Sequence, residues 1–279
     1  MPQQHHQPST TPLSATIVLY RSDLAQLRAT IASVGCACEG LEGVLRLFLV
    51  DQSQDPIYAT RVAQLARDFE TMDGVALELI CRDSNGGYGA GHNAVPIDQL
   101  GELHLVLNPD VVLSPGMLSL WQRTLRHHQD VAALAPRGCN ANGDEEFLAK
   151  RYPSVLVLCL RAFAPPWLQR RFASRLHHYE LRDLPTQGLL QDVPLLSGCC
   201  ILIRTNAWRS VGGFDERFFL YFEDYDLCQR LRKQGRIVRD PSVTVVHHGG
   251  QAARKGWRHI RWFVGGGLRF FSKWGWRWV

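Results

Sequence analysis

The chain has 279 residues, of which 46% are hydrophobic and 20% are charged, and its formal net charge at pH 7 is +5. This composition is typical of a globular protein that can bury a sizeable core, and it excludes a mainly disordered chain. The basic excess belongs to the end of the chain, because no acidic residue follows Asp240 while seven Lys or Arg lie between Gly249 and Val279.

The cysteines and the first residues indicate a cytosolic protein. None of the eight cysteines forms a CxxC pair or a zinc-type spacing, so we expect them to be reduced and mostly buried. Residues 1–13 are mostly polar and lack the apolar core of a signal peptide, which predicts a disordered leader. No apolar run reaches the roughly 18 residues that span a bilayer. We therefore expect this leader, a main domain at residues 14–250 and a basic aromatic tail at residues 251–279.

Short apolar runs that suit buried strands alternate with segments whose apolar residues recur at helical spacing. Helices are expected from Leu24 to Val34, with Ser22 or Asp23 as cap, from Val62 to Phe69 and from Met117 to Leu125. This alternation predicts an α/β fold with a mostly parallel sheet, covered by helices on both faces. The strands are expected at residues 15–20, 44–50, 76–81, 104–107, 131–136, 193–203 and 242–246.

Ligands of such sheets bind beyond the carboxyl ends of the strands, where Asp51 and two polar segments lie. Residues 85–93 contain four glycines within six residues, which lets backbone amides come close to a ligand. The segment includes a dinucleotide-binding fingerprint, but it follows the third strand rather than the first, so a Rossmann dehydrogenase is not expected. The Asp110 carboxylate of Asn108-Pro109-Asp110 could hold Mg²⁺ or Mn²⁺ against a diphosphate. A plain glycine-rich turn and an Asx-Pro turn are the structural alternatives.

The stretch from Gly212 to Arg236 combines aromatic and acidic residues. Four aromatics lie between Phe218 and Phe222, and Glu223 and Asp224 then open a predicted helix that Gly235 would end. An acidic pair at a helix start, directly after an aromatic run, indicates a general base in a sugar-binding site. The alternative is that the two acids only complement the helix dipole.

Residues 137–192 have an irregular pattern. Asn140–Asp144 is expected to form a hairpin turn, and the apolar run at residues 155–160 is soon interrupted by prolines. A basic patch follows, made of Arg170, Arg171 and Arg175. We expect this insert to face the acceptor or a membrane.

Taken together, these segments resemble the inverting family-2 glycosyltransferases of the GT-A fold, especially bacterial rhamnosyltransferases. The resemblance covers roughly residues 14–250 and depends on the order and spacing of its motifs, each of which is modest alone. The motifs are Val18-Leu19-Tyr20, Val50-Asp51, Asn85–Asn93, Leu107–Val111, Ser197-Gly198, Gly212–Asp226 and Val246-His247-His248.

The resemblance implies a donor-binding role for several matching positions. Asp51 would hydrogen-bond the nucleobase, and the backbone near Leu19 and Tyr20 would frame it. The segment at residues 85–93 would lie along the ribose and the diphosphate. The residues expected to bind the nucleotide sugar are thus Leu19, Tyr20, Asp51, Asn85, Gly86, Gly87, Tyr88, Gly91, Asn93 and Asn108.

The same resemblance implies the metal and catalytic residues. Asp110 would bind Mg²⁺ or Mn²⁺ with His247 completing its coordination; His248 has equal chemistry, and only the family pattern favours His247. Asp224 would be the general base, and Glu223 would orient it or the acceptor. The family's metal motif often starts with an acid, so Asn108 departs from it and should weaken metal affinity.

The implied function is the transfer of a sugar, L-rhamnose from its dTDP donor, to a hydroxyl of a lipid-linked or cell-surface glycan. The donor class is a dTDP- or UDP-sugar, and the acceptor is polyprenyl-linked or another glycan. One displacement inverts the stereochemistry and needs one base, and Asp224 with an ordinary pKa near 3.9 would already be ionised at neutral pH. Two alternatives stay open: a nucleotidyltransferase, and a non-catalytic glycan- or membrane-binding module on a degenerate transferase scaffold.

The tail combines aromatic and basic residues without acids, which is typical of an interfacial membrane anchor. This predicts a cytoplasmic protein, peripheral on the inner face of the cytoplasmic membrane. The Gly265-Gly266-Gly267 run predicts two short segments rather than one helix. Nucleic-acid binding suits the same composition, but no nucleic-acid fold accompanies it, so no nucleic-acid partner is expected. In a third interpretation the aromatics complete the core. They are Trp257, Trp262, Phe263, Phe270, Phe271, Trp274, Trp276 and Trp278.

Overall fold

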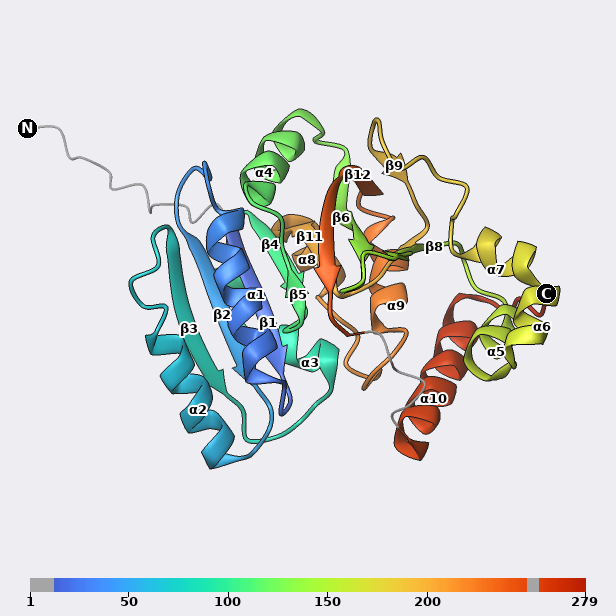
Figure 1. Cartoon of the computed structure of the whole chain (residues 1–279), viewed down its shortest axis with the longest axis horizontal. Helices are drawn as coiled ribbons and strands as arrows, with labels where there is room; N and C mark the ends of the chain where they lie inside the picture. The colour runs from blue at the N-terminus through green and yellow to red at the C-terminus, as the bar shows by residue number, and fades with distance from the viewer. Residues whose placement is uncertain (1–12, 250–255) are drawn as a thin grey trace, which may run out of the picture.

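The computed structural model describes residues 13–249 and 256–279. One mixed sheet runs through the molecule (Figure 1). Its principal strands are β1 (Leu13–Leu19), β2 (Leu45–Asp51), β3 (Val75–Cys81), β4 (Leu103–Leu107), β5 (Val111–Val112), β6 (Val131–Cys139), β11 (Cys200–Arg204) and β12 (Arg236–His247). The predicted leader lies outside the described residues except for Leu13, which already belongs to β1.

The strand order is β3-β2-β1-β4-β11-β6-β12-β5. The strands from β3 to β4 are parallel, as the alternating pattern predicts, whereas β11 runs antiparallel between β4 and β6. Two short strands extend this sheet: β7 (Glu145–Glu146) pairs with β6, and β9 (Gln191–Asp192) pairs with β12. Two others, β8 (Ala149–Lys150) and β10 (Leu195–Leu196), pair with each other in a separate sheet. The predicted hairpin turn between β6 and β7 is present, with Asn140 N donating to Asp144 O at 2.9 Å.

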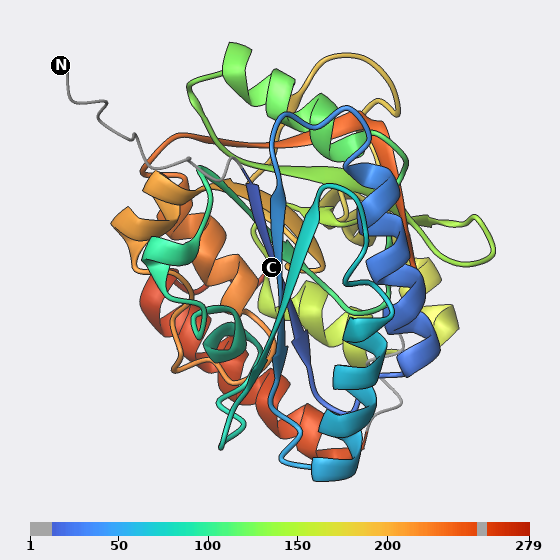
Figure 2. The ribbon, with the colours of Figure 1, turned by 90° about the vertical axis from the view of Figure 1, so that its left-hand side faces the viewer.

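Helices cover both faces of the sheet (Figure 2). On one face α1 (Leu24–Ala37), α2 (Pro56–Arg67) and α4 (Met117–His127) pack over one hydrophobic cluster. On the other lie α3 (Tyr88–His92), α8 (Thr205–Val211) and α9 (Glu223–Leu231), and the 3₁₀ turn η1 (Ile97–Gln99) follows α3 in the sequence. Asp23 caps α1 as predicted, because its Oδ1 accepts hydrogen bonds from Ala25 N and Gln26 N.

The acidic helix α9 ends earlier than the sequence suggests. It stops at Leu231, four residues before the glycine that was expected to end it. Gly235 instead permits the start of β12, since a Cβ there would lie 2.6 Å from Asp130 O. The absence of a side chain at Gly235 therefore lets the start of β12 lie close to the start of β6.

A third layer covers the far end of the sheet (Figure 1). It contains α5 (Val155–Phe163), α6 (Pro166–Arg171), α7 (Ala173–Tyr179) and α10 (Trp257–Trp274). Phe270 and Phe271 of α10 are buried against α5 and α7. The interpretation in which tail aromatics complete the core therefore holds for these two residues.

The prediction of two short tail segments is wrong, because α10 is continuous through all three glycines. The physical reason is close packing. A Cβ at Gly266 would lie 2.8 Å from Tyr221 O, and Gly267 packs against the Phe222 ring. At Gly266 the segment before α9 leaves no room for a larger side chain.

Candidate active site

The first two predicted donor-binding segments meet at one edge of the sheet. Leu19, the last residue of β1, lies in register beside Asp51, the last residue of β2. Asp51 is buried, and its Oδ1 accepts a hydrogen bond from Ser53 N at 2.8 Å. Leu19 is fully buried and its carbonyl oxygen accepts a hydrogen bond from Gln52 N at 3.0 Å, whereas Tyr20 is 57% exposed.

The glycine-rich segment is fixed to this edge through Gln52. The Gln52 amide donates to Gly87 O at 3.0 Å and accepts from Gly86 N at 3.2 Å, while Asn85 Oδ1 accepts from Gly87 N at 2.9 Å. Gly87 has φ 94°, and a Cβ there would lie 2.1 Å from Phe219 O. Its conformation and this close approach both favour glycine. The glycine therefore lets the loop pack against the aromatic segment before α9.

The end of the same segment also makes protein contacts. A Cβ at Gly91 would lie 2.5 Å from the Val18 side chain. The Asn93 amide donates to Phe214 O and to Glu216 Oε1, both at 2.9 Å, and accepts from Phe214 N at 2.9 Å. Asn93 thus ties the glycine segment to the chain that leads into α9.

Asp110 and His247 lie side by side because β5 pairs with β12. His247 Nε2 is 3.5 Å from Asp110 Oδ1, and that oxygen is buried without a hydrogen-bond partner. A Cβ at Gly249 would lie 2.3 Å from Asp110 Oδ2 and 2.9 Å from His247 Nε2. His248 is exposed and only its backbone reaches Asp110, donating from N to O at 2.8 Å. The geometry therefore places His247, rather than its neighbour, beside the carboxylate.

Glu146 on β7 was not singled out by the sequence. Its Oε2 lies 2.7 Å from His247 Nδ1. A histidine that ligates a metal commonly has its other ring nitrogen bonded to a carboxylate, which fixes the ring and its tautomer. The unpaired Asp110 oxygen, the free Nε2 and this carboxylate fit a divalent cation. Across residues 13–249 and 256–279, however, no three His, Cys, Asp or Glu side chains form a group that could hold a metal ion.

Asn108 and Tyr88 connect these segments to the central strands. Asn108 follows β4, and its backbone N donates to Cys199 O at 2.8 Å. One residue, Pro109, separates it from Asp110. The Tyr88 hydroxyl donates to Gly198 O at 2.7 Å, and Gly198 N donates to Asp224 Oδ2 at 2.9 Å. The glycine segment and Asp224 are thus linked through one residue.

Asp224 and Glu223 occupy different environments at the start of α9. Asp224 Oδ2 and Oδ1 accept from Gly198 N and Tyr225 N at 2.9 and 2.8 Å, whereas Glu223 Oε2 is buried without a partner. Burial raises the pKa of Asp224 to about 6, and these backbone hydrogen bonds limit the rise. Burial, and then the charge of Asp224, raise the pKa of Glu223 well above its ordinary value. The two backbone hydrogen bonds favour the ionised form of Asp224.

This finding corrects the expectation of an ordinary pKa for Asp224. The predicted value near 3.9 assumed a solvated carboxyl, whereas the aromatic residues around α9 withdraw Asp224 from water. A base with a pKa close to neutral pH is better matched to proton transfer.

Asp226, two residues further on, holds α9 against α10. It is fully buried and accepts hydrogen bonds from Arg230 Nε and Trp274 Nε1, both at 2.8 Å. Lys273 Nζ lies 2.6 Å from Asp226 Oδ1, the oxygen that also accepts from Trp274. The third acid of the motif is therefore structural and fixes the last turns of α10.

Two cavities border α10. The first, the α5–α10 cavity, has a volume of about 420 Å³ and extends from Glu223 and Asp224 to Phe163 and Ile260. Its walls come from α5, α7, α9 and α10. Because Asp224 and Glu223 line it, this cavity is the candidate acceptor side of the site.

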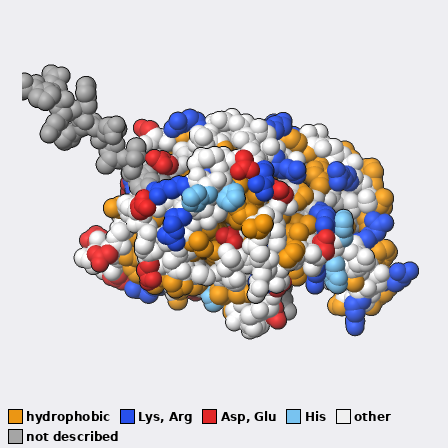
Figure 3. Space-filling view, turned by 90° about the horizontal axis from the view of Figure 1, so that it is seen from above, with side chains coloured by type: hydrophobic (Ala, Val, Ile, Leu, Met, Phe, Trp, Pro, Cys, Tyr) orange, Lys and Arg blue, Asp and Glu red, His pale blue; other side chains and the backbone are white. Residues whose placement is uncertain are grey.

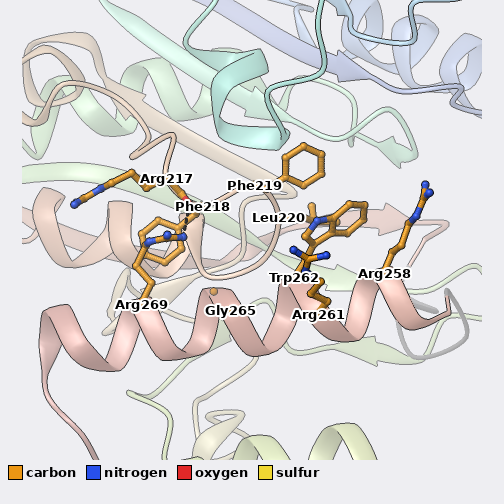
Figure 4. Close-up of a pocket in the computed structure, with 10 residues that line it drawn as sticks. Arg217, Phe218, Phe219, Leu220, Arg258, Arg261, Trp262, Gly265 and Arg269 are labelled. Carbon is orange, nitrogen blue, oxygen red and sulfur yellow. Dashed lines mark hydrogen bonds between the residues drawn. The ribbon is translucent and has the colours of Figure 1, made fainter.

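The second cavity, the arginine groove, lies on the other side of α10 and has a volume of about 550 Å³ (Figure 4). Phe219 and Trp262 pack together in it, with ring centroids 4.6 Å apart. Arg217 is paired with Asp215 at 2.6 Å, and the Arg269 guanidinium lies over the Phe218 ring. Arg258 and Arg261 make no ion pair with any residue that the structure describes. The groove therefore presents a surplus of positive charge.

A sequence profile described as "Glycosyltransferase like family 2" matches residues 5–258 of the chain. The chain belongs to this family. The predicted family and the predicted class of enzyme, a glycosyltransferase, are thereby confirmed.

Two curated relatives illustrate the family-2 likeness. The N-acetylglucosaminyl-diphospho-decaprenol L-rhamnosyltransferase of Mycobacterium tuberculosis (strain H37Rv) is 33% identical over 185 residues, which cover 62% of this chain and 59% of the relative. Rhamnosyltransferase WbbL of Escherichia coli (strain K12) is 24% identical over 243 residues, covering 73% of this chain and 80% of the relative. The chain thus matches less than two thirds of the mycobacterial protein's length.

Solved structures confirm the GT-A fold of this family-2 chain. GalNAc-T7, solved with UDP, GalNAc and Mn²⁺, superposes with a TM-score of 0.64 at 12% identity, over 96% of this chain and 48% of that one. The mannosyltransferase PcManGT from Pyrobaculum calidifontis, solved with GDP-Man and Mn²⁺, has a TM-score of 0.57 at 14% identity, over 95% and 65%. Both similarities show the fold alone.

Proposed function

We propose that this family-2 glycosyltransferase is an inverting rhamnosyltransferase that transfers L-rhamnose from dTDP-rhamnose to a hydroxyl of a lipid-linked glycan. The names of the mycobacterial and E. coli relatives support the sugar, and the mycobacterial name supports a polyprenyl-diphosphate acceptor. The observation that carries the proposal is Asp224, which faces a cavity on one side and is linked through Gly198 to the glycine segment on the other.

In this proposal Asp224 is the general base. It takes the proton of the acceptor hydroxyl as that oxygen attacks the anomeric carbon from the face opposite the leaving diphosphate. Two backbone amides hold both carboxylate oxygens, so the side chain has a fixed direction. General-base assistance of this kind contributes about 10²–10⁴-fold. Glu223 would orient the acceptor or Asp224.

On the donor side, Asp51 would bind the nucleobase, with Leu19 and Tyr20 beside it. The segment that contains Asn85, Gly86, Gly87, Tyr88, Gly91 and Asn93 would form one wall along the ribose and diphosphate, next to Asn108. The contacts that Gln52 makes with this segment would hold it in place.

Asp110 and His247 would hold the divalent cation, Mg²⁺ or Mn²⁺, and Glu146 would orient His247. When bound, the cation would neutralise the charge that builds on the departing nucleoside diphosphate. Two protein ligands and an amide at position 108 suit a cation that arrives together with its nucleotide sugar.

The acceptor side would face the inner surface of the cytoplasmic membrane. Along the described chain no helix has both the length and the apolarity needed to cross a bilayer. Instead, the arginine groove and the exposed side chains of α10 provide basic and apolar groups together. The end of the molecule near α6 and α7 also shows Lys, Arg and His side chains among hydrophobic ones (Figure 3). Such surfaces bind anionic bilayers.

A donor panel tests this function. Transfer from dTDP-rhamnose and from UDP-hexoses to an N-acetylglucosaminyl-diphospho-polyprenol would be measured with and without EDTA. We expect rhamnose transfer that EDTA abolishes. Absence of both sugar transfer and metal-dependent release of nucleoside diphosphate would instead support a non-catalytic module, and release of diphosphate with nucleotide transfer would support a nucleotidyltransferase.

A further inference from the structure

The α5–α10 cavity has chemically different ends. Glu223, which is 5% exposed, and half-buried Asp224 lie at its inner end. Phe163 and Ile260 also line it, yet they are 56% and 42% exposed, so they mark the mouth. A volume of about 420 Å³ falls within the usual range for small-ligand sites, roughly 300–1,000 Å³.

The wall between the two ends carries surplus positive charge. Arg161 lines the cavity and lies 3.3 Å from Glu180, which also pairs with Arg182 at 2.6 Å. Lys150 is buried behind this wall, 5.7 Å from the centroid of the Tyr179 ring. Two guanidinium groups, those of Arg161 and Arg182, thus share one carboxylate. A dianionic group would find a favourable potential beside Arg161, which presents a planar donor fork suited to phosphate oxygens.

The mouth continues into an exposed apolar surface. On α10 the side chains of Trp257, Ile260, Val264 and Leu268 are exposed and recur every three or four residues, so they lie along one side of the helix. Ile260 belongs both to this stripe and to the cavity. On the opposite wall Phe163 leads to α6, whose Trp167 is also exposed. An apolar chain that leaves the cavity would therefore stay on apolar side chains.

We propose that the α5–α10 cavity binds the diphosphate and the first isoprenoid units of a polyprenyl-diphosphate-linked acceptor. The acceptor sugar lies at Asp224, the diphosphate lies against Arg161, and the isoprenoid chain leaves between Phe163 and Ile260 toward the bilayer. This inference rests on the proposed function for the identity of the acceptor. It assigns to that acceptor a site, an anion contact and an exit.

The test compares two acceptors with the full chain. One is N-acetylglucosaminyl-diphospho-polyprenol in detergent micelles, and the other is methyl N-acetylglucosaminide, which has neither diphosphate nor isoprenoid. Arg161→Gln should raise the KM of the polyprenyl acceptor at least tenfold and leave the KM values of the methyl glycoside and dTDP-rhamnose within twofold. Arg161→Lys should recover part of the loss. An equal rise for both acceptors, or no rise, would overturn the assignment.

The apolar exit has a matched control on the same helix. Ile260 and Val264 are both exposed on the α10 stripe, but only Ile260 lines the cavity. Ile260→Ser should raise the KM of the polyprenyl acceptor several-fold more than Val264→Ser. Equal effects would show that the stripe acts only on the bilayer and would refute the exit.

A binding measurement separates this inference from the proposed function. Geranyl diphosphate, titrated calorimetrically without any sugar donor, should bind the wild-type protein at least tenfold more tightly than Arg161→Gln, and excess dTDP should not displace it. Displacement by dTDP would place the compound in the donor site and overturn the inference. If the wild type transferred no rhamnose but kept this Arg161-dependent binding, the function would be wrong and the lipid-diphosphate site would stand.

Discussion

Gly266 of α10 lies directly against the backbone carbonyl of Tyr221, three residues before Asp224. A Cβ at Gly266 would come within 2.8 Å of that oxygen. Tyr221 and Phe222 both have positive φ, 71° and 69°, which is costly for aromatic residues and must be held by the surrounding structure. The contact therefore makes α10 part of the support for the acidic pair.

This relationship predicts opposite effects for two neighbouring glycines. Gly266→Ala should lower the melting temperature, because overpacking typically costs about 1–3 kcal/mol, and should reduce kcat by displacing Asp224. Gly265→Ala is the matched control, since nothing lies within 4 Å of its added Cβ. It should raise the free energy of unfolding by about 0.5–1 kcal/mol, as glycine is a poor helix former. Thermal melts and transfer rates of the two variants check this; equal melting temperatures would contradict the packing account.

Asp224→Asn should reduce kcat by about 10²–10⁴-fold with an unchanged circular dichroism spectrum, because the base is lost and the shape is kept. Asp73→Asn is the control, as Asp73 is exposed and precedes β3 at the opposite edge of the sheet. A loss of less than tenfold in Asp224→Asn would remove Asp224 from the role of base.

The pH dependence follows from the raised pKa of Asp224. Below about pH 6 the carboxyl is protonated and cannot accept the hydroxyl proton, so kcat/KM should fall as pH falls through about 6. The contribution of Asp224 to stability has the opposite sign. Its folded pKa exceeds its unfolded value, so that contribution is present below the unfolded pKa and is lost as pH rises through about 6. If kcat/KM fell only near pH 4, the result would contradict the raised pKa that burial gives to Asp224.

Glu146→Gln should weaken the affinity for Mn²⁺ by about 10–100-fold, because His247 loses the carboxylate that orients it. Glu145→Gln on the same strand is the control, since Glu145 lies beside Arg137 instead, at 3.4 Å. Mn²⁺ binding in the presence of dTDP, followed by electron paramagnetic resonance, provides the measurement. Equal affinities in both variants would separate Glu146 from the metal site.

Reversing the charges of Arg258 and Arg261 should weaken binding to anionic liposomes by roughly 30-fold or more, because each basic residue near such a surface contributes about 1 kcal/mol. Arg61→Glu with Arg67→Glu on α2 is the matched control at the other end of the molecule (Figure 1). Point substitutions are preferable to truncation, since removal of α10 would also remove buried Phe270 and Phe271. Flotation that is unchanged by the reversal at Arg258 and Arg261 would rule out the groove as the contact.

The sequence predicted what depends on local pattern. Runs of apolar residues located the strands, and acids or glycines directly after them located Asp51, Asp110 and the segment at residues 85–93. Because parallel strands end at one edge of a sheet, these positions could be expected to meet. Asp224 was found in the same way, from an acidic pair at a helix start.

What the sequence did not reveal depends on contacts between distant segments. Glu146 reaches His247 only because β7 and β12 both flank β6. The need for glycine at position 266 becomes clear only from the contact between α10 and the Tyr221 carbonyl. A run of three glycines normally breaks a helix, yet here tertiary packing keeps it continuous. The pKa of Asp224 likewise depends on burial by α5, α7 and α10, which no local pattern contains.

The central claim is a single displacement in which Asp224 activates the acceptor hydroxyl. The most direct measurement is the anomeric configuration of the new linkage, determined by NMR on the product that the wild-type protein forms from dTDP-rhamnose. We predict inversion relative to the donor, with no product from Asp224→Asn under the same conditions. Retention of configuration would contradict the account, because it requires a second displacement for which Asp224 alone is not enough.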